Sequence, residues 1–169
     1  MAEIRPEASG DEPDIRRVVE QAFGGPAEAD LVDELRRIGA LTLSLVAVQD
    51  GRVVGHVAFS PVTIDGLPDD ASAVGLAPVA VEPPLQGHGI GSALIREGLD
   101  RCREAGHCAS VVLGHASYYP RFGYRPASEW GLASEFDSPP EHFMALELRS
   151  GALEDCAGQV RYHPAFGAF

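Results

Sequence analysis

The sequence predicts a mixed α/β fold built on a mostly antiparallel sheet that contains one parallel pair of strands. Two apolar runs of strand length flank Asp50-Gly51, a dipeptide that favours a tight hairpin because both central positions accept positive φ. Further along, a strand at 74–81, a helix to about Ala105 and a strand at 110–114 follow one another. Such a crossover makes its two strands parallel.

Length and composition favour one compact domain over residues 1–169. The chain has 169 residues, 45% of them hydrophobic, which is enough to bury a core without disulfides or a metal. The formal net charge of -12, from 25 acidic and 13 basic residues, opposes binding to nucleic acids and to anionic membranes. A cationic amine substrate suits this charge, although an acidic surface also simply keeps proteins dispersed.

Cysteine usage and the N-terminus predict a cytoplasmic protein. Cys102, Cys108 and Cys156 form no CxxC pair and no zinc-type spacing with histidine, so we expect reduced, structural thiols. The N-terminus lacks an apolar signal core, and no stretch approaches the roughly 18 apolar residues of a membrane span.

Two amphipathic helices are expected after a short first strand. The first opens with acidic residues and a proline and stops at Gly24 and Gly25. The second has Pro26 at its start and Gly39 after its end. The apolar faces consist of Ile15, Val18, Val19, Ala22 and Phe23 in the first helix, and of Leu31, Leu35 and Ile38 in the second.

The C-terminal third is expected to hold one late strand and a docking tail. "HFMALELRSG" is typical of a strand, and "ALEDCAGQVRYHPAFGAF" of turns followed by a segment with aromatic anchors.

Three glycines precede the crossover helix in "QGHGIGS", residues 86–92. Glycine weakens helices and strands by about 0.5–1 kcal/mol relative to alanine, so this cluster indicates a role for the backbone itself. A phosphate-binding turn needs N–H groups that point one way with no Cβ between them, and a helix N-terminus adds the positive end of its dipole. A plain tight turn is the structural alternative.

Two other phosphate loops do not fit this stretch. A P-loop ends in Gly-Lys-Ser/Thr, and the loop contains no lysine. The dinucleotide fingerprint GxGxxG fails because Ser92 and Leu94 stand where glycine or alanine is required. The next strand ends in Gly114 and His115 instead of an acidic ribose ligand. Nucleotide hydrolysis and hydride transfer are therefore disfavoured.

The loop does meet the pattern Q/R-x-x-G-x-G/A, and here the sequence resembles the GNAT-type N-acetyltransferases. "LAPVAVEPPLQGHGIGSALI", "VVLGHASYYPRFGY", "HFMALEL" and "GQVRYHPAF", in this order, look like the YhbS-like branch of that superfamily over almost the whole chain. The resemblance implies the GNAT fold: a mixed, mostly antiparallel sheet with helices on both faces, whose fourth and fifth strands run parallel and splay apart around a crossover helix. It also implies acetyl-CoA as co-substrate and no metal. The implied cofactor-binding residues are Ala80, Val81, Gln86, Gly87, His88, Gly89, Ile90, Gly91 and Ser92.

The resemblance singles out Tyr119 in "SYYPRFGY" as the general acid. Ser117 could cap a short helical turn here, and Gly123 would end it. In that family a tyrosine hydroxyl protonates the departing CoA thiolate. A phenol with a reference pKa of about 10 stays protonated at neutral pH and can donate as charge develops on sulfur. The structural alternative is that these aromatic side chains only pack.

The implied reaction is direct attack of a primary amine on the thioester through a tetrahedral intermediate, and it needs a proton acceptor. The fourth strand carries no acid before Glu82, so the base stays open among several residues and a water chain. A relay through Cys102 or Cys108 is disfavoured because both are expected to be buried. The other candidate bases are His56, His88, His115 and Glu28. Two cations, Arg96 and Arg121, could meet the CoA phosphates. The acceptor pocket could be flanked by Glu28, Asp30, Asp33 and Glu34.

Two other functions remain open at this stage. One is a non-catalytic sensor that binds acyl-CoA, which would keep the glycine loop without needing a phenol beside sulfur. The other is transfer of a longer acyl group. The acceptor amine is not identified by the sequence, and the resemblance is compatible with a homodimer.

Overall fold

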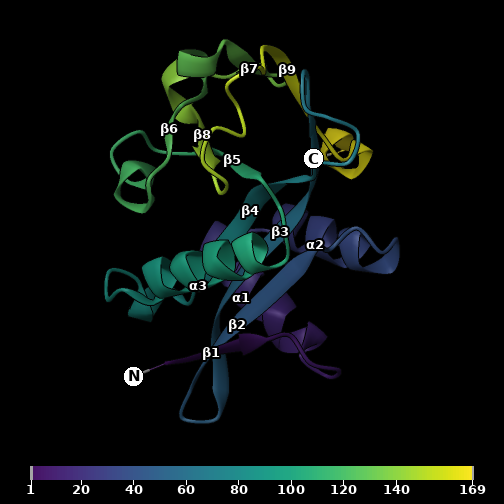
Figure 1. The fold of residues 1–169 in the computed structure, drawn as a ribbon. Coiled ribbons are helices and arrows are strands. Elements are labelled where there is room, and N and C mark those ends of the chain that lie inside the picture. Colours follow the sequence, from purple (N-terminus) through teal and green to yellow (C-terminus); the bar gives the residue numbers. More distant parts are fainter. Residues whose placement is uncertain (1, 169) are drawn as a thin grey trace. The chain divides into compact units, whose positions relative to one another are not determined.

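The computed structural model describes residues 2–168 and contains three α-helices and nine strands within them (Figure 1). The helices are α1 (Glu12–Phe23), α2 (Ala27–Arg37) and α3 (Ile90–Glu104). The strands are β1 (Glu3–Pro6), β2 (Leu43–Gln49), β3 (Arg52–Ile64), β4 (Ala73–Val81), β5 (Ala109–Leu113), β6 (Arg125–Pro126), β7 (Leu132–Ser134), β8 (Phe143–Glu147) and β9 (Gly158–Tyr162).

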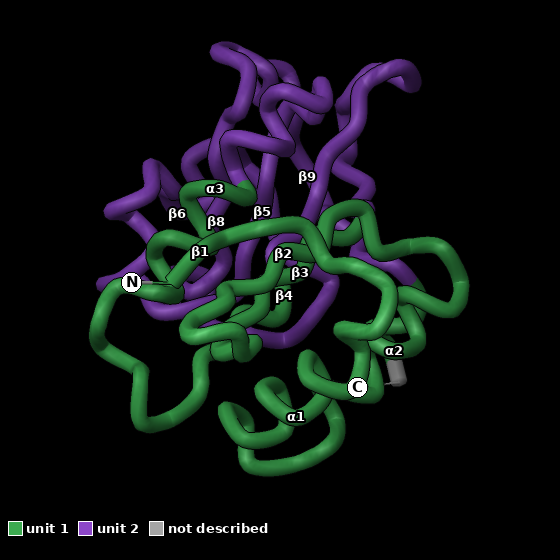
Figure 2. The backbone as a smooth tube through the Cα atoms, turned by 90° about the horizontal axis from the view of Figure 1, so that it is seen from below, with its two compact units in different colours: residues 1–60, 77–98, 164–169 green, residues 61–76, 99–163 purple. Residues whose placement is uncertain are grey.

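The chain divides into two compact units, coloured separately in Figure 2. Unit 1 comprises residues 1–60, 77–98 and 164–169, and unit 2 comprises residues 61–76 and 99–163. Hydrogen-bonded strands follow the order β1-β2-β3-β4-β5-β8-β6, and β9 pairs with β3 and β7. The predicted mixed, mostly antiparallel sheet is therefore confirmed; the prediction of one domain stays a prediction.

In unit 1, the hairpin between β2 and β3 forms as the sequence predicts. Gln49 pairs with Arg52, and the two turn residues take positive φ, 54° at Asp50 and 75° at Gly51. β1 adds to the free edge of β2 in antiparallel register. The sheet built on this hairpin thus supplies the two faces against which the helices of this unit pack.

Helices cover both faces of the unit 1 sheet. Val46 of β2 and Ala80 of β4 belong to one buried cluster with apolar residues of α1 and α2. Gly55 of β3 faces the other way: a Cβ built there would lie 3.0 Å from Leu94 Cδ1 and 3.2 Å from Ile90 Cγ2 of α3. Because successive strand residues point to opposite faces, α3 begins on the side opposite α1 and α2.

Two residues predicted to lie on the buried helix faces are exposed instead. Phe23 is 45% exposed and Ile38 is 39% exposed. Phe23 is the last residue of α1, directly before the left-handed cap at Gly24, and Ile38 follows the last residue of α2. Both side chains lie at the end of a helix, where packing against the core has stopped, so each predicted stripe is one residue too long.

In unit 2, the crossover strands pair in parallel as predicted. Ala73 of β4 lies opposite Ala109 of β5, and the register continues to Gly75 and Val111. β8 pairs antiparallel with β5 on its other side. β5 is therefore a central strand of this unit, bonded on both edges.

The C-terminal tail contains a strand that the sequence analysis missed. β9 pairs antiparallel with Val62–Ile64 of β3 and parallel with β7. Its side chains alternate, with Val160 and Tyr162 buried and Arg161 exposed, which is the one signal that could have revealed it. The last turn, Pro164–Ala168, contacts α2 and buries Phe166, as expected of a docking segment.

The three cysteines are free and buried. Within residues 2–168, none of the helices combines the length and apolar character that crossing a membrane requires.

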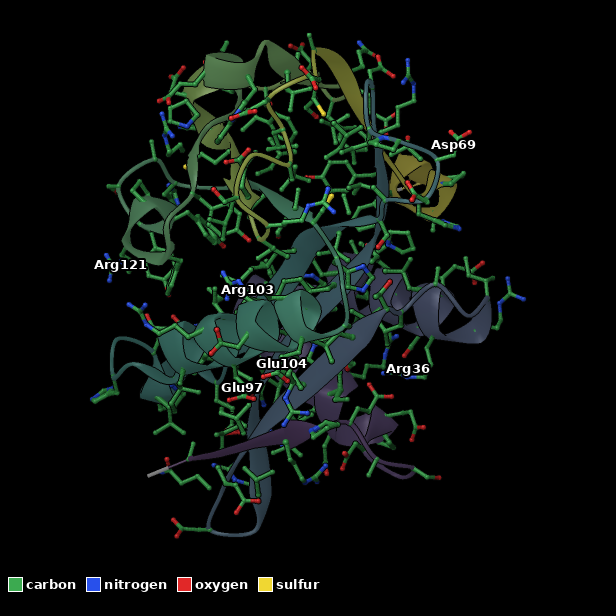
Figure 3. All side chains as sticks on the ribbon, viewed as in Figure 1. Arg36, Asp69, Glu97, Arg103, Glu104 and Arg121 are labelled. Carbon is green, nitrogen blue, oxygen red and sulfur yellow. The ribbon has the colours of Figure 1, made fainter. Side chains whose placement is uncertain are left out.

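A buried polar chain runs through the unit 1 sheet from β3 to α2. The Nε2 atom of His56 lies 2.8 Å from Ser44 Oγ, which lies 2.6 Å from Glu7 Oε1. Arg36, labelled in Figure 3, donates to both Glu7 oxygens at 2.8 and 3.0 Å. The Ser44 hydroxyl donates to the Glu7 carboxylate, so Nε2 of His56 carries the proton that Ser44 accepts. The Nδ1 atom is then unprotonated, and it has no hydrogen-bond partner among the described residues.

Burial lowers the pKa of His56 to about 4; the nearby Glu7 raises it slightly and Arg36 lowers it. Because the folded protein binds the proton less readily than the unfolded chain, the uncharged ring stabilises the fold above pH 6.5, and this stabilisation is lost as the pH falls towards 4.

We expect the free energy of unfolding to fall by about 3 kcal/mol between pH 7 and pH 4 through this histidine alone. His56→Gln keeps a donor toward Ser44 but cannot titrate, so its stability should depend less steeply on pH. Urea denaturation of both proteins across this range measures the difference. Parallel curves for the two proteins would show that His56 does not titrate with folding.

Candidate functional site

The loop between β4 and α3 is joined to the end of its own strand. β4 ends at Val81, a short 3-10 turn spans Pro83–Leu85, and α3 begins at Ile90. The side-chain amide of Gln86 donates to the carbonyl oxygen of Val81 at 3.0 Å. This bond fixes where the loop starts. Gln86 and Val81, both predicted to bind the cofactor, therefore also have a structural role.

Gly87 and Gly89 take backbone conformations that other residues rarely adopt. Their φ angles are +79° and +90°, and a Cβ built on either would meet nothing within 4 Å. The need for glycine therefore comes from the backbone conformation, because the surroundings leave room for a side chain. His88, between them, is exposed, and its Nδ1 lies 2.9 Å from the carbonyl oxygen of Gln86.

The loop leads directly into a long helix. The main-chain N–H of Ala93 donates to the carbonyl oxygen of Gly89 at 3.0 Å, so the amides of Ile90, Gly91 and Ser92 precede the helical ladder. Ile90 is buried, and Gly91 and Ser92 are half-buried. A helix start of this kind carries the positive end of the dipole and N–H groups directed along the axis, which suits a phosphate.

Ala80 and Val81 lie at the buried end of β4, with 3% and 8% of their surface exposed. Ala80 packs toward α1 and α2, while the carbonyl oxygen of Val81 accepts the bond from Gln86. The next residue is tied to β3, because Glu82 N donates to Val54 O at 2.9 Å.

Glu82 is not suited to act as the general base. Its side chain is 5% exposed, and each carboxylate oxygen pairs with an arginine: Oε2 with Arg17 and Oε1 with Arg52, both at 2.8 Å. Arg17 also donates to the carbonyl oxygen of Val53 at 2.9 Å. A buried carboxylate held by two guanidinium groups is committed to that pairing.

The acidic residues of α2 are largely neutralised by arginines. Arg16 pairs with Asp30 at 2.8 Å and with Asp33 at 2.7 Å, and Arg37 pairs with Glu34. The predicted acidic flank of an acceptor pocket is therefore mostly an ion-paired surface. Of the remaining candidate bases, His115 and His88 are exposed, Glu28 is half-buried and His56 is fully buried.

Unit 2 places Tyr119 in a short 3-10 helix, Tyr119–Phe122, shortly after β5. Gly123 ends this turn with a φ of 99°, as predicted. The predicted cap at Ser117 is wrong, because Tyr118 occupies the N-cap position and makes no side-chain capping bond. The turn contains one proline and two aromatic residues, whose rings pack together, and the Ser117 hydroxyl was therefore a misleading signal for a cap.

The Tyr119 ring lies within a cluster of aromatic side chains. Its centroid is 5.1 Å from that of Tyr118 and 5.7 Å from that of Tyr124, both nearly perpendicular. Burial raises the pKa of Tyr119 to about 12, with a further contribution from Tyr118. The phenol therefore stays protonated at neutral pH and can act as a proton donor.

Arg121 and the cysteines complete the predicted candidates. The guanidinium of Arg121 lies 4.3 Å from the centroid of the Tyr118 ring, and Figure 3 shows its side chain at the surface of unit 2. Arg96 is exposed on α3. Burial raises the pKa of the Cys102 thiol to about 12 and also raises that of Cys108, so neither is a thiolate at neutral pH.

Comparison with known proteins relates this arrangement to acetyltransferases. Residues 3–127 match a family model described as an acetyltransferase (GNAT) domain. The chain is 41% identical over 167 residues to the uncharacterized N-acetyltransferase YhbS of Escherichia coli strain K12, covering 98% of this chain and 99% of that protein. It is 43% identical over 143 residues to the uncharacterized N-acetyltransferase YjhQ of the same strain, covering 83% of this chain and 79% of YjhQ.

Two solved structures are similar over almost the whole chain. YhbS from Escherichia coli in complex with CoA has a TM-score of 0.94 at 41% identity, covering 99% of this chain and 93% of that chain. A GNAT family acetyltransferase from Brucella melitensis in complex with acetyl-CoA has a TM-score of 0.81 at 42% identity, covering 98% of both chains. The match to the family model and the full-length relatives establish that the chain belongs to the GNAT family of acetyltransferases.

Proposed function

We propose that residues 1–169 act as one N-acetyltransferase domain that transfers the acetyl group of acetyl-CoA to a primary amine. The observation that carries this proposal is the glycine loop at the start of α3, where Gly87 and Gly89 have positive φ and open surroundings. Two similar proteins were solved with CoA and with acetyl-CoA, which supports the same ligand here.

In the proposed complex, the main-chain amides from Gly87 to Ser92 bind the pyrophosphate of CoA. The loop residues expected to hold the cofactor are Gln86, Gly87, His88, Gly89, Ile90, Gly91 and Ser92. The end of β4, at Ala80 and Val81, is expected to receive the pantetheine amides or the acetyl carbonyl. Because the Val81 carbonyl already accepts a bond from Gln86, its N–H is the more suitable group for the acetyl oxygen.

In the proposed reaction, the uncharged amine attacks the thioester carbonyl, a tetrahedral intermediate forms, and the C–S bond breaks. The leaving thiolate takes a proton from Tyr119, whose raised pKa keeps it protonated. The nitrogen, cationic after the attack, loses one proton, and uptake of one proton by the phenolate restores Tyr119. No covalent enzyme intermediate is needed, which agrees with the raised pKa of the Cys102 thiol.

The loop conformation is tested by comparing two glycines that share a backbone conformation. Gly89→Ala and Gly24→Ala both place a Cβ at positive φ in open space, so each should lower the free energy of unfolding by about 1–2 kcal/mol. Only Gly89→Ala should also weaken CoA binding, by roughly tenfold or more, because it alone changes the proposed phosphate loop. Calorimetric titration of CoA measures this; equal affinities for both variants would argue against the loop as the binding site.

The role of Tyr119 is tested by removing only its hydroxyl. We expect Tyr119→Phe to lower kcat by roughly 100-fold or more, since general acid catalysis is typically worth that much, and to leave the Kd for CoA unchanged. The measurement is thioester consumption with acetyl-CoA and a panel of amines, beside Tyr118→Phe as the matched control. If CoA binds and no amine is acetylated, the chain is better described as an acyl-CoA sensor.

A further inference from the structure

The ring of Tyr119 occupies the space that a side chain at Gly114 would need. A Cβ built on Gly114, the residue directly after β5, would lie 2.2 Å from Tyr119 Cε2, 2.8 Å from Cδ2 and 3.2 Å from Cζ. Cζ carries the phenolic hydroxyl. The ring edge next to the reactive group therefore rests on a glycine where a methyl group has no room.

The Gly114 backbone is held in place and cannot easily withdraw from the ring. Its N–H donates to the carbonyl oxygen of His142 at 2.9 Å. β5 itself is bonded to β4 on one edge and to β8 on the other. Apolar contacts are favourable near 3.5–4.0 Å, so an added methyl group would displace the ring by about 1.3 Å or more.

A second contact fixes the ring from the side of Tyr124. The hydroxyl groups of Tyr124 and Ser110 are 2.7 Å apart, and both residues are buried, with 1% and 0% exposure. The Tyr124 ring meets the Tyr119 ring edge-on, at 84°. Ser110 lies within β5 and is paired with Val74 and Leu146, so it gives Tyr124 a rigid anchor.

Ser110 lies on β5, and Gly114 follows the strand four residues later and continues its pairing through the bond to His142, so the alternation of side chains places both on the same face. We propose that Gly114, together with the Ser110–Tyr124 hydrogen bond, positions the Tyr119 phenol for proton transfer. Gly114 and Tyr124 are positioning residues, which act only through Tyr119. This inference rests on the proposed role of Tyr119 as general acid.

The consequence for the reaction follows from how sensitive proton transfer is to distance. A hydroxyl must lie within hydrogen-bond reach of the departing sulfur, and a misplacement of about 1 Å can lower a rate by roughly 100-fold. The displacement caused by a methyl group at Gly114 is of that size. Binding of CoA is expected to remain, because the proposed phosphate loop lies elsewhere in the sequence.

The first experiment is a double-mutant cycle on kcat. Gly114→Ala should lower kcat by roughly 10- to 100-fold, with a change in the Kd for CoA of less than about twofold. In the Tyr119→Phe background, which keeps the same ring and the same clash, Gly114→Ala should lower kcat by less than about twofold. Equal losses in both backgrounds would overturn the proposal, because a general packing defect would multiply with the loss of the hydroxyl.

A control for packing damage comes from Gly98 of α3. A Cβ there would lie 2.3 Å from Phe59 Cε1, a ring clash of similar severity that involves no tyrosine. Gly98→Ala should reduce thermal stability and reduce kcat by the same factor with or without the Tyr119 hydroxyl. If Gly114→Ala does not fold, Tyr124→Phe takes its place in the cycle, with a loss of roughly 3- to 10-fold expected only when Tyr119 is present.

The second measurement needs no acceptor amine. The chain has four tyrosines, so protein labelled with 13C at tyrosine Cζ gives four resonances, which single Tyr→Phe variants assign. Gly114→Ala should shift the Tyr119 resonance and lower its pKa from about 12 towards 10, because the displaced ring loses burial. Gly25→Ala, whose Cβ meets nothing within 4 Å, should change neither. An unmoved Tyr119 resonance in Gly114→Ala would overturn the positioning role.

The two hypotheses fail in different ways. If Gly114→Ala moves the Tyr119 resonance but Tyr119→Phe leaves turnover unchanged, Tyr119 is not the general acid. The role of Gly114 and Tyr124 in catalysis is then refuted with it. If Tyr119→Phe abolishes turnover but the cycle is multiplicative, the general acid stands and the positioning by Gly114 and Tyr124 is refuted.

Discussion

The pairing of Glu82 with Arg17 and Arg52 holds together the part of unit 1 from which the glycine loop extends. A buried carboxylate is tolerated only when its charge is matched, and here three elements meet to match it: α1, the start of β3 and the end of β4. Loss of either arginine would leave a poorly compensated charge directly before Pro83. The position of the loop thus depends on an ion pair as well as on the hydrophobic core.

The local parts of the fold could be predicted from the sequence because their signals are local. The turn at Asp50-Gly51 and the cap at Gly24 depend on backbone preferences of one or two residues, and both were predicted correctly. β9 was missed because its alternation spans only Val160 to Tyr162, and because its pairing with β3, about 100 residues earlier, is not visible in any local window. Phe23 was assigned to the core because periodicity gives the face of a helix but not the residue at which packing ends.

The candidate site divides in the same way. The glycine pattern predicted a special role for the backbone of this loop, but neither the positive φ of Gly87 and Gly89 nor the bond from Gln86 to Val81. Glu82 was considered as a base because its position near the loop is visible in the sequence, while its partner Arg17, 65 residues away, is not. The acidic net charge likewise did not reveal that most acidic side chains of α2 are paired with arginines, Arg16 and Arg37.

Burial of Tyr119 also sets how the proposed chemistry would respond to alkaline solution. A lysine-like amine becomes a nucleophile only as it loses its proton near pH 10.4, and an ordinary tyrosine near pH 10 would ionise over the same interval. In this protein the pKa of Tyr119 is raised to about 12, so the phenol would still be protonated at the pH at which the amine loses its proton. The aromatic cluster thereby separates the two ionisations. Activity would rise with pH as the acceptor amine loses its proton, and it would fall at still higher pH as the phenol ionises.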